Sequence, residues 1–378
     1  MKQTLQFIAW PAIAGLLAAL LILDRWILPV RVDHIEDGRE PVSYAQAVRA
    51  ATPSVVNIYT AKLVSSNTPG VVRNPFAQNR TPRQRIERSL GSGVIVSPEG
   101  HILTNNHVIA EADAIQVMLH DGRSSSAVVI GTDQATDLAV LKVDLPDLQA
   151  IEIGNSDRVR VGDVVLAIGN PLGFGHSVTQ GIVSALGRYG LQQSMYEDYI
   201  QTDATIHLGN SGGALINTQG QLLGVNTLIY TGSNRSVSGY TGNTGIGISL
   251  AIPAKLAIFV LQDLIQYGEV IRGWLGVSVE PIGVFNGSGT AQPALSVQTV
   301  APASPAAKAG VQVGDLITHI DGAAVQNGRQ TMHEIARLRP GDTIEISVRR
   351  ERQSLELRAV VGVLTQSSGT ANVPEAAS

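Results

Sequence analysis

Residues 207–230 read HLGNSGGALINTQGQLLGVNTLIY, and this stretch indicates the fold more clearly than any other part of the chain. After a glycine-rich turn, two apolar runs flank the sequence NTQG, which is typical of two antiparallel strands joined by a tight turn. Similar short runs continue from about Tyr44 to Pro253, with turn residues roughly every 8–12 positions. Their alternation of apolar and polar side chains predicts an antiparallel β-barrel or sandwich over this region.

A second folded unit follows the first. The run AKLAIFVLQDLIQYG, at 254–268, has apolar residues at helical spacing and ends in glycine, so it predicts a helix that closes the first domain. Further short strands and one short helix, around 330–338, are enough for an independent second domain. We therefore expect a mainly β protein with domains at 45–268 and 269–364 and a disordered tail at 365–378.

The composition excludes several classes of function. The chain has 378 residues, a net charge of −4 and no cysteine. The charge does not fit a nucleic-acid-binding surface, so we expect no nucleic-acid partner. The lack of cysteine excludes a thiol nucleophile, a disulfide framework and cysteine-containing zinc sites. The eight histidines show no HExxH spacing, so we expect neither a catalytic metal nor another cofactor.

The N-terminus carries an apolar run, Phe7–Leu23, whose 17 residues reach the lower limit for a membrane-spanning helix. No small-x-small cleavage site follows it, which favours an uncleaved anchor at 1–30 and a linker at 31–44. A cleaved signal peptide is the alternative. Lys2 is the only charged side chain before the run, so the N-terminus is expected on the cytoplasmic side and the folded domains outside.

A candidate catalytic centre can be assembled from three motifs. In GNSGG the glycines around Ser211 allow a substrate backbone to approach, and the N–H groups of Gly209 and Ser211 could form an oxyanion hole. A serine nucleophile needs a base, for which His107 is the candidate, and Asp137 could fix the imidazole tautomer. Each motif alone is also compatible with a turn or a structural role. The chain order His, Asp, Ser is that of the chymotrypsin-type template.

Several longer motifs resemble the HtrA family of serine proteases over residues 45–364. They are TNNHVI, TDLAVLKV, GNPLGFGHSVTQGIVSALGR and GNSGGALIN, followed by GWLGV and VAPASPAAKAGVQVGDLITHIDG, which resemble a PDZ domain. The resemblance implies a trypsin-like double β-barrel followed by one PDZ domain. The rival interpretation, a chaperone or binding protein that kept the protease fold, is disfavoured because all three candidate triad residues are present.

An N-terminal anchor with a single PDZ domain is similar to the membrane-anchored stress-sensor branch of that family. The resemblance implies a homotrimer at the inner membrane with its catalytic and PDZ domains in the periplasm. It also implies protein substrates of the anti-sigma-factor type and activation by the C-terminal peptides of misfolded outer-membrane proteins.

The resemblance also assigns a peptide-binding site to the second domain. Trp274, Leu275, Gly276 and Val277 would form the loop that captures a C-terminal carboxylate, with the peptide added as a strand beside Val277–Glu280. The alternative is that these residues, and those of the short helix, are simply core residues. Arg188, in the sequence GRYG, would lie on the loop that relays peptide binding to the catalytic loops.

Substrate preference and activation can be inferred from the residues before Ser211. In the trypsin-like template Thr205 floors the S1 pocket, which predicts cleavage after small apolar residues and not after lysine or arginine. Asn210 replaces the aspartate that pairs with a freed N-terminus in zymogens, so activation must take another route. His207-Leu208 departs from the family pattern, and His107 is the better base because His207 lies on the tight loop of the serine itself.

Overall fold

The computed structural model describes residues 14–19, 43–65, 84–170, 175–188, 196–207, 209–229, 248–285, 291–351 and 353–363. The expected tail lies outside these residues, as does most of the expected anchor and linker. Of the anchor, 14–19 is helical. Within the described residues, no helix is long and apolar enough to cross a membrane. The chain divides into two units, Met1–Tyr44 and Ala45–Ser378, and all elements below belong to the second.

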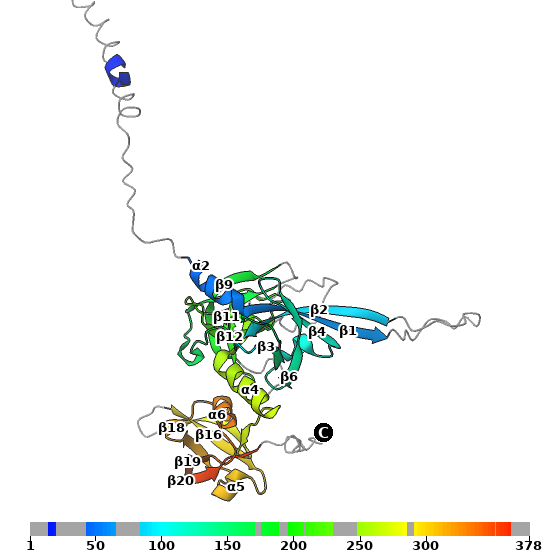
Figure 1. The fold of residues 1–378 in the computed structure, drawn as a ribbon. Helices are drawn as coiled ribbons and strands as arrows, with labels where there is room; N and C mark the ends of the chain where they lie inside the picture. The colour runs from blue at the N-terminus through cyan, green and yellow to red at the C-terminus, as the bar shows by residue number, and fades with distance from the viewer. Residues whose placement is uncertain are drawn as a thin grey trace, which may run out of the picture. The chain divides into compact units, whose positions relative to one another are not determined.

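The first sheet has seven antiparallel strands in the order β5-β4-β1-β2-β3-β7-β6. They are β1 (Val55–Ser65), β2 (Gln84–Ile95), β3 (His101–Asn105), β4 (Ala114–Met118), β5 (Ser124–Ser126), β6 (Val128–Asp133) and β7 (Leu138–Lys142). The helix α2 (Ala45–Ala51) and the 3₁₀ turn η2 (Thr52–Ser54) precede them. β1 and β2 form a long hairpin (Figure 1). The apolar residues that alternate along these strands meet in one core, which includes Ile58, Ile102 and Leu141.

The second sheet is a closed barrel in the order β10-β13-β12-β11-β8-β9. Its strands are β8 (Val164–Gly169), β9 (Ser177–Arg188), β10 (Tyr199–Thr202), β11 (Ala214–Ile216), β12 (Leu222–Ile229) and β13 (Ser249–Pro253), with the 3₁₀ turn η3 (Ser156–Arg158) before β8. The predicted hairpin is confirmed as β11 and β12. Gly220 in its turn has a φ of 88°, which glycine adopts without strain.

The helix α4 (Ala254–Tyr267) follows the barrel and confirms the helix predicted from the apolar spacing. It ends at Gly268, whose left-handed φ of 77° caps the last turn. Its apolar face, including Leu256 and Val260, packs in one cluster with Leu138 and Val140 of β7. The helix thereby ties the barrel to the first sheet.

The second domain has its own sheet, in the order β15-β16-β17-β19-β20 with β18 beside β17, and a separate pair of β14 and β21. The elements are β14 (Gly273–Trp274), β15 (Val277–Phe285), β16 (Ala291–Val300), α5 (Pro305–Ala309), β17 (Leu316–Ile320), β18 (Ala323–Ala324), α6 (Gly328–Ala336), β19 (Thr343–Arg350), β20 (Gln353–Val360) and β21 (Gly362–Val363). Helix α6 begins two residues before the predicted start because the side chain of Asn327 accepts the Gln330 N–H and caps it. The short helices α2 and α5 were not predicted.

Buried ion pairs join the second domain to the elements before it. Asp263 of α4 is fully buried and accepts two hydrogen bonds from the guanidinium of Arg339, at 2.5 and 2.8 Å. Arg272 donates to Asp133 at 2.5 Å and lies over the ring of Tyr196, 4.4 Å from its centroid. A buried carboxylate left without its cation is strongly unfavourable, so these pairs restrict how the two domains can separate.

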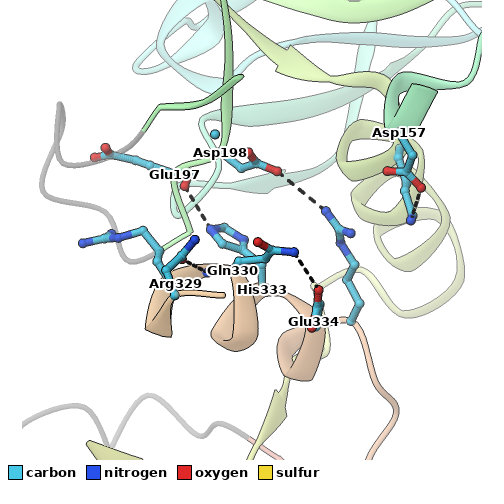
Figure 2. A pocket seen from close by; sticks show the side chains of 11 residues that line it. Asp157, Glu197, Asp198, Arg329, Gln330, His333 and Glu334 are labelled. Carbon is cyan, nitrogen blue, oxygen red and sulfur yellow. Dashed lines mark hydrogen bonds and ion pairs between the residues drawn. The ribbon is translucent and has the colours of Figure 1, made fainter. Parts of the chain in front are cut away.

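A pocket of about 410 Å³ lies where α6 faces residues 197–198 (Figure 2). It is lined by Asp157, Gly187, Glu197, Asp198, Lys255, Asn327, Arg329, Gln330, His333, Glu334 and Arg337. His333 is buried at its edge, and its Nε2 lies 2.9 Å from the carbonyl oxygen of Glu197. Because a carbonyl only accepts, Nε2 carries the proton and donates. Tyr196 meets the same imidazole edge-on.

Burial lowers the pKa of His333 below its ordinary value of 6.5. The nearby Asp198 and the hydrogen bond to the Glu197 carbonyl raise the pKa and oppose this effect. The positive charges of Arg337 and Arg329 lower the pKa further. The pKa in the folded chain is therefore lower than in the unfolded chain. The contact stabilises the fold fully above pH 6.5, and its contribution is lost as the pH falls through the lowered pKa.

We predict that His333→Gln reduces the loss of thermal stability on acidification between about pH 8 and pH 5. Glutamine keeps a side-chain N–H that can reach Glu197 but does not titrate. The measurement is the melting temperature of both chains across this range, and the difference between them isolates the histidine from all other titrating groups. Parallel curves for the two chains would show that His333 does not titrate at this contact.

Candidate active site

The candidate base is placed by the end of β3. His107 lies on the one-turn helix α3 (Asn106–Ile109), which directly follows this strand. The turn is tied to a second segment because the carbonyl oxygen of Asp137 accepts the Asn106 N–H at 3.0 Å and the Asn105 side-chain amide at 3.1 Å. The backbone thus brings the candidate acid to the candidate base.

The Asp137 carboxylate holds the His107 ring in one orientation. Its Oδ1 accepts the His107 backbone N–H at 2.9 Å, and its Oδ2 lies 2.6 Å from Nδ1. An ionised carboxylate only accepts hydrogen bonds, so Nδ1 carries the proton and Nε2 of the neutral ring is left as a base. The aspartate is buried, whereas the histidine side chain is 44% exposed and therefore accessible to a substrate. Asp137 adopts a left-handed φ of 56°, which the sequence did not suggest.

Thr227 of β12 connects the three candidate residues. Its hydroxyl donates to Asp137 Oδ2 at 3.1 Å, and its carbonyl oxygen accepts the Ser211 hydroxyl at 2.9 Å. A hydroxyl has one proton, so in this rotamer Ser211 does not donate to His107, and a rotation of the serine side chain is needed before proton transfer. Sequence reasoning missed Thr227 because one threonine in an apolar strand carries no distinctive signal.

The nucleophile loop, residues 209–213, contacts the first sheet through Gly212. Gly209 has a φ of 98° and Gly212 a φ of 83°. A Cβ at Gly212 would lie 2.1 Å from the carbonyl oxygen of Ser92, so no other residue fits there without moving β2. The N–H groups of Gly209 and Ser211 have no hydrogen-bond partner among the described residues. Leu208 lies outside them.

Other predicted site residues can be placed. Thr205 is exposed, and its carbonyl oxygen accepts the Thr179 hydroxyl at 2.7 Å. Arg188 was expected on a loop but is the last residue of β9, where its Nε donates to Gln201 at 2.8 Å. The Asn210 side chain is fully buried, and neither of its amide atoms has a partner in the described structure. His207 is exposed, and its carbonyl oxygen accepts the Asn210 N–H at 2.9 Å.

In the second domain, the loop Trp274–Val277 joins β14 to β15. The carbonyl oxygens of Leu275 and Gly276 accept N–H groups of Ala306 and Ala301, at 3.0 and 2.8 Å. In a trans peptide the N–H points opposite to the carbonyl, so the N–H groups of Gly276 and Val277 point away from these donors. Gly276 has a φ of 80°, and a Cβ there would lie 2.4 Å from Ser304.

Strand β15, which follows this loop, has one edge without a partner strand in the described structure. β15 pairs only with β16 in the sheet described here, so its other edge is an open edge. On helix α6, Ala336 is buried and Ile335 packs against the domain core. Within the described residues, no group of histidine, aspartate and glutamate side chains could hold a metal ion.

Comparisons with known proteins follow the same division into two domains. Residues 91–225 match the family model of the trypsin-like peptidase domain, and residues 273–361 match that of the PDZ domain. The chain is 40% identical over 361 residues to the serine endoprotease DegS of Escherichia coli K12, covering 93% of this chain and 96% of that protein. It is 41% identical over 360 residues to a probable periplasmic serine endoprotease DegP-like of Pseudomonas fulva, covering 88% and 73%.

Solved structures give the same result. The structure described as the HtrA-type protease AlgW with tripeptide is 44% identical in sequence, with a TM-score of 0.69, and the match covers 87% of this chain and 99% of that one. A structure of the same protease with a decapeptide is 45% identical, with a TM-score of 0.67, over 86% and 99%.

Proposed function

Because the chain belongs to the HtrA family of serine proteases and is a serine endopeptidase, we propose that His107, Asp137 and Ser211 are its catalytic triad. The observation that carries this proposal is the clamp on the imidazole. Asp137 binds both the backbone N–H and Nδ1 of His107, which leaves Nε2 as the base. Thr227, bonded to both Asp137 and Ser211, links the clamp to the nucleophile.

The proposed reaction has two steps. The Ser211 hydroxyl turns from Thr227 to Nε2 of His107, gives up its proton and attacks the carbonyl carbon of the substrate peptide bond. The oxygen that becomes negative is bound by the N–H groups of Gly209 and Ser211. His107 then gives its proton to the leaving amine, and an acyl ester remains on Ser211. A water molecule, deprotonated by His107 in turn, releases the acid and restores the serine.

Thr205 sets the substrate preference in this proposal. A threonine on the pocket floor offers no carboxylate for a lysine or arginine side chain, and burying an unpaired ammonium is strongly unfavourable. Small apolar side chains such as those of valine and alanine carry no charge, so burying them in this pocket costs little free energy. We therefore infer that the enzyme cleaves after such residues.

We predict that, of two reporter peptides identical except for valine or lysine before the scissile bond, the valine peptide is hydrolysed with at least ~10-fold higher kcat/KM. A wild-type chain that prefers the lysine peptide would show that Thr205 is not the floor of the S1 pocket. Thr205→Asp should raise the activity towards the lysine peptide.

For the second domain we propose capture of a C-terminal peptide. The N–H groups of Gly276 and Val277 point away from the bonded carbonyl side of the loop, and in this proposal they bind the carboxylate, with Trp274 and Leu275 forming the rest of the loop. The open edge of β15 offers main-chain groups to an extended peptide. That solved relatives are described with a tripeptide and a decapeptide supports this proposal.

Such a peptide is proposed to activate the enzyme. Asn210 excludes the zymogen route, and in the structure Ser211 is not yet bonded to His107. Arg188, at the end of β9, is proposed to relay the signal from the second domain. A hundredfold activation requires the peptide to bind the active state more tightly by only about 2.7 kcal/mol, which a few strand hydrogen bonds can supply.

The relatives guide the cellular assignment. By likeness to a relative named as periplasmic, we propose a periplasmic enzyme. From the apolar N-terminal run and the sequence resemblance we further propose an inner-membrane anchor at residues 1–30 and a homotrimer. Its domains would span 45–268 and 269–364. Its substrate would be of the anti-sigma-factor type, and the C-termini of misfolded outer-membrane proteins would be its activators. The alternative of a protease-fold chaperone requires an inactive triad, whereas the clamp on His107 favours an active one.

We predict that a short uncleaved peptide with a free apolar C-terminus raises hydrolysis of a separate reporter substrate by roughly 10- to 100-fold, and that Arg188→Ala abolishes this rise. Arg160→Ala, an exposed arginine elsewhere on the barrel, is the control and should respond like the wild type. The same peptide with an amidated C-terminus should have no effect. A flat response of the wild type would rule out activation and leave the protease assignment intact.

A further inference from the structure

Ser92 of β2 reaches from the first sheet to the nucleophile loop of the second barrel. The residue is completely buried. Its hydroxyl donates to the carbonyl oxygen of Gly209 at 2.6 Å, and its backbone N–H donates to the carbonyl oxygen of Ser211 at 2.8 Å. One residue thus holds the carbonyl groups on both sides of the Asn210–Ser211 peptide bond.

These bonds restrict three consecutive peptide planes. Ser92 holds the first plane, Gly209–Asn210, and the third, Ser211–Gly212. The Gly213 N–H holds the middle plane, Asn210–Ser211, by donating to the Asn210 carbonyl oxygen at 3.0 Å. Because each peptide group is planar, a fixed Asn210 carbonyl also fixes the direction of the Ser211 N–H. The Gly209 N–H is connected to the first plane only through the torsions of a glycine, which has the widest freedom to rotate. The Gly209–Asn210 plane is also held by the Asn210 N–H, which donates to the His207 carbonyl oxygen at 2.9 Å. The Ser92 hydroxyl is therefore one of two restraints on the plane next to the less constrained oxyanion-hole donor, and the one that comes from the first sheet.

The hydroxyl of Ser92 is itself fixed by a second hydrogen bond. Its oxygen accepts the backbone N–H of Asn170 at 3.0 Å, and the side-chain carbonyl of Asn170 accepts the Gly175 N–H at 2.9 Å. With this donor on one side, the hydroxyl proton points at Gly209. In a buried chain of hydrogen bonds each bond polarises the next, so the Asn170 N–H strengthens the bond from the Ser92 hydroxyl to the Gly209 carbonyl.

We propose that Ser92 is a positioning residue for the oxyanion hole, acting through the carbonyl group of Gly209. The inference rests on the proposed roles of Gly209 and Ser211. Ser92 touches neither substrate nor the reacting atoms, so its loss leaves substrate binding unchanged. An N–H group that is misdirected when the oxyanion forms weakens binding of the transition state alone, which lowers kcat and not KM.

The test compares Ser92→Ala with Thr202→Val in the full chain. Thr202 is an equally buried hydroxyl with the same pattern of bonds, donating to the Ile182 carbonyl at 2.7 Å and accepting the Ala204 N–H at 3.0 Å. Ser92→Ala is expected to lower kcat about tenfold or more, towards the ~10²-fold that loss of an oxyanion donor costs, with KM unchanged. Thr202→Val should keep the wild-type kcat.

A second readout separates positioning from general loss of structure. A peptide boronate forms a tetrahedral adduct on the serine, and its affinity should fall with kcat in Ser92→Ala while the affinity for an uncleaved substrate analogue does not. If Ser92→Ala does not show cooperative melting, Ser92→Cys, whose thiol is a weaker donor, should show the same selective loss of kcat.

Three results would overturn the inference. They are a wild-type kcat in a folded Ser92→Ala or Ser92→Cys chain, an equal fall of kcat in Thr202→Val, and a loss that appears in KM alone. Each leaves Ser211 as the nucleophile. A wild-type chain that neither hydrolyses the reporter nor binds the boronate would instead overturn the proposed function, and this inference with it.

Discussion

The hydrogen bonds across the seam between the first sheet and the second barrel are the interaction on which the rest of the structure depends. His107 and Asp137 come from the first sheet, whereas Ser211 and Thr227 come from the barrel. Neither half alone contains both the proposed base and the proposed nucleophile. Thr227 donates to Asp137, and the backbone N–H of Ser92 donates to the carbonyl oxygen of Ser211. These bonds fix the position of the barrel relative to the first sheet. These bonds are buried, where a low dielectric strengthens them.

A polar seam has its own cost. Asn210 and Asn226 are fully buried there, and some of their side-chain amide atoms have no partner in the described structure. Such atoms are rare in protein interiors and each is unfavourable unless water or a later contact satisfies it. Asn210 directly precedes the nucleophile. A change in the conformation of this loop that gave the Asn210 amide a hydrogen-bond partner would therefore be favourable. Such a change is consistent with an enzyme in which the Ser211 hydroxyl is bonded to Thr227 and not to the proposed base.

The sequence predicted the elements whose pattern is local. The β11–β12 hairpin and helix α4 follow from alternation, apolar spacing and a stop glycine, and the triad candidates follow from short motifs. The sequence did not predict the features that depend on tertiary contacts. The one-turn helix α3 was not predicted, Arg188 was expected on a loop but ends β9, and Thr227 and Ser92 have no distinguishing neighbours in the sequence. The partners of Thr227 and Ser92 lie 90 and 117 residues away in the sequence, at Asp137 and Gly209.

The central claim is that Ser211 is reactive only because the folded seam gives it a base. Labelling by a fluorophosphonate, followed by digestion and mass spectrometry of the adduct, tests it most directly. One adduct is expected, on the peptide that contains Ser211, formed by the native chain and abolished both by heat denaturation and by Asp137→Asn. An adduct on another serine, or equal labelling of native and denatured chains, would contradict it.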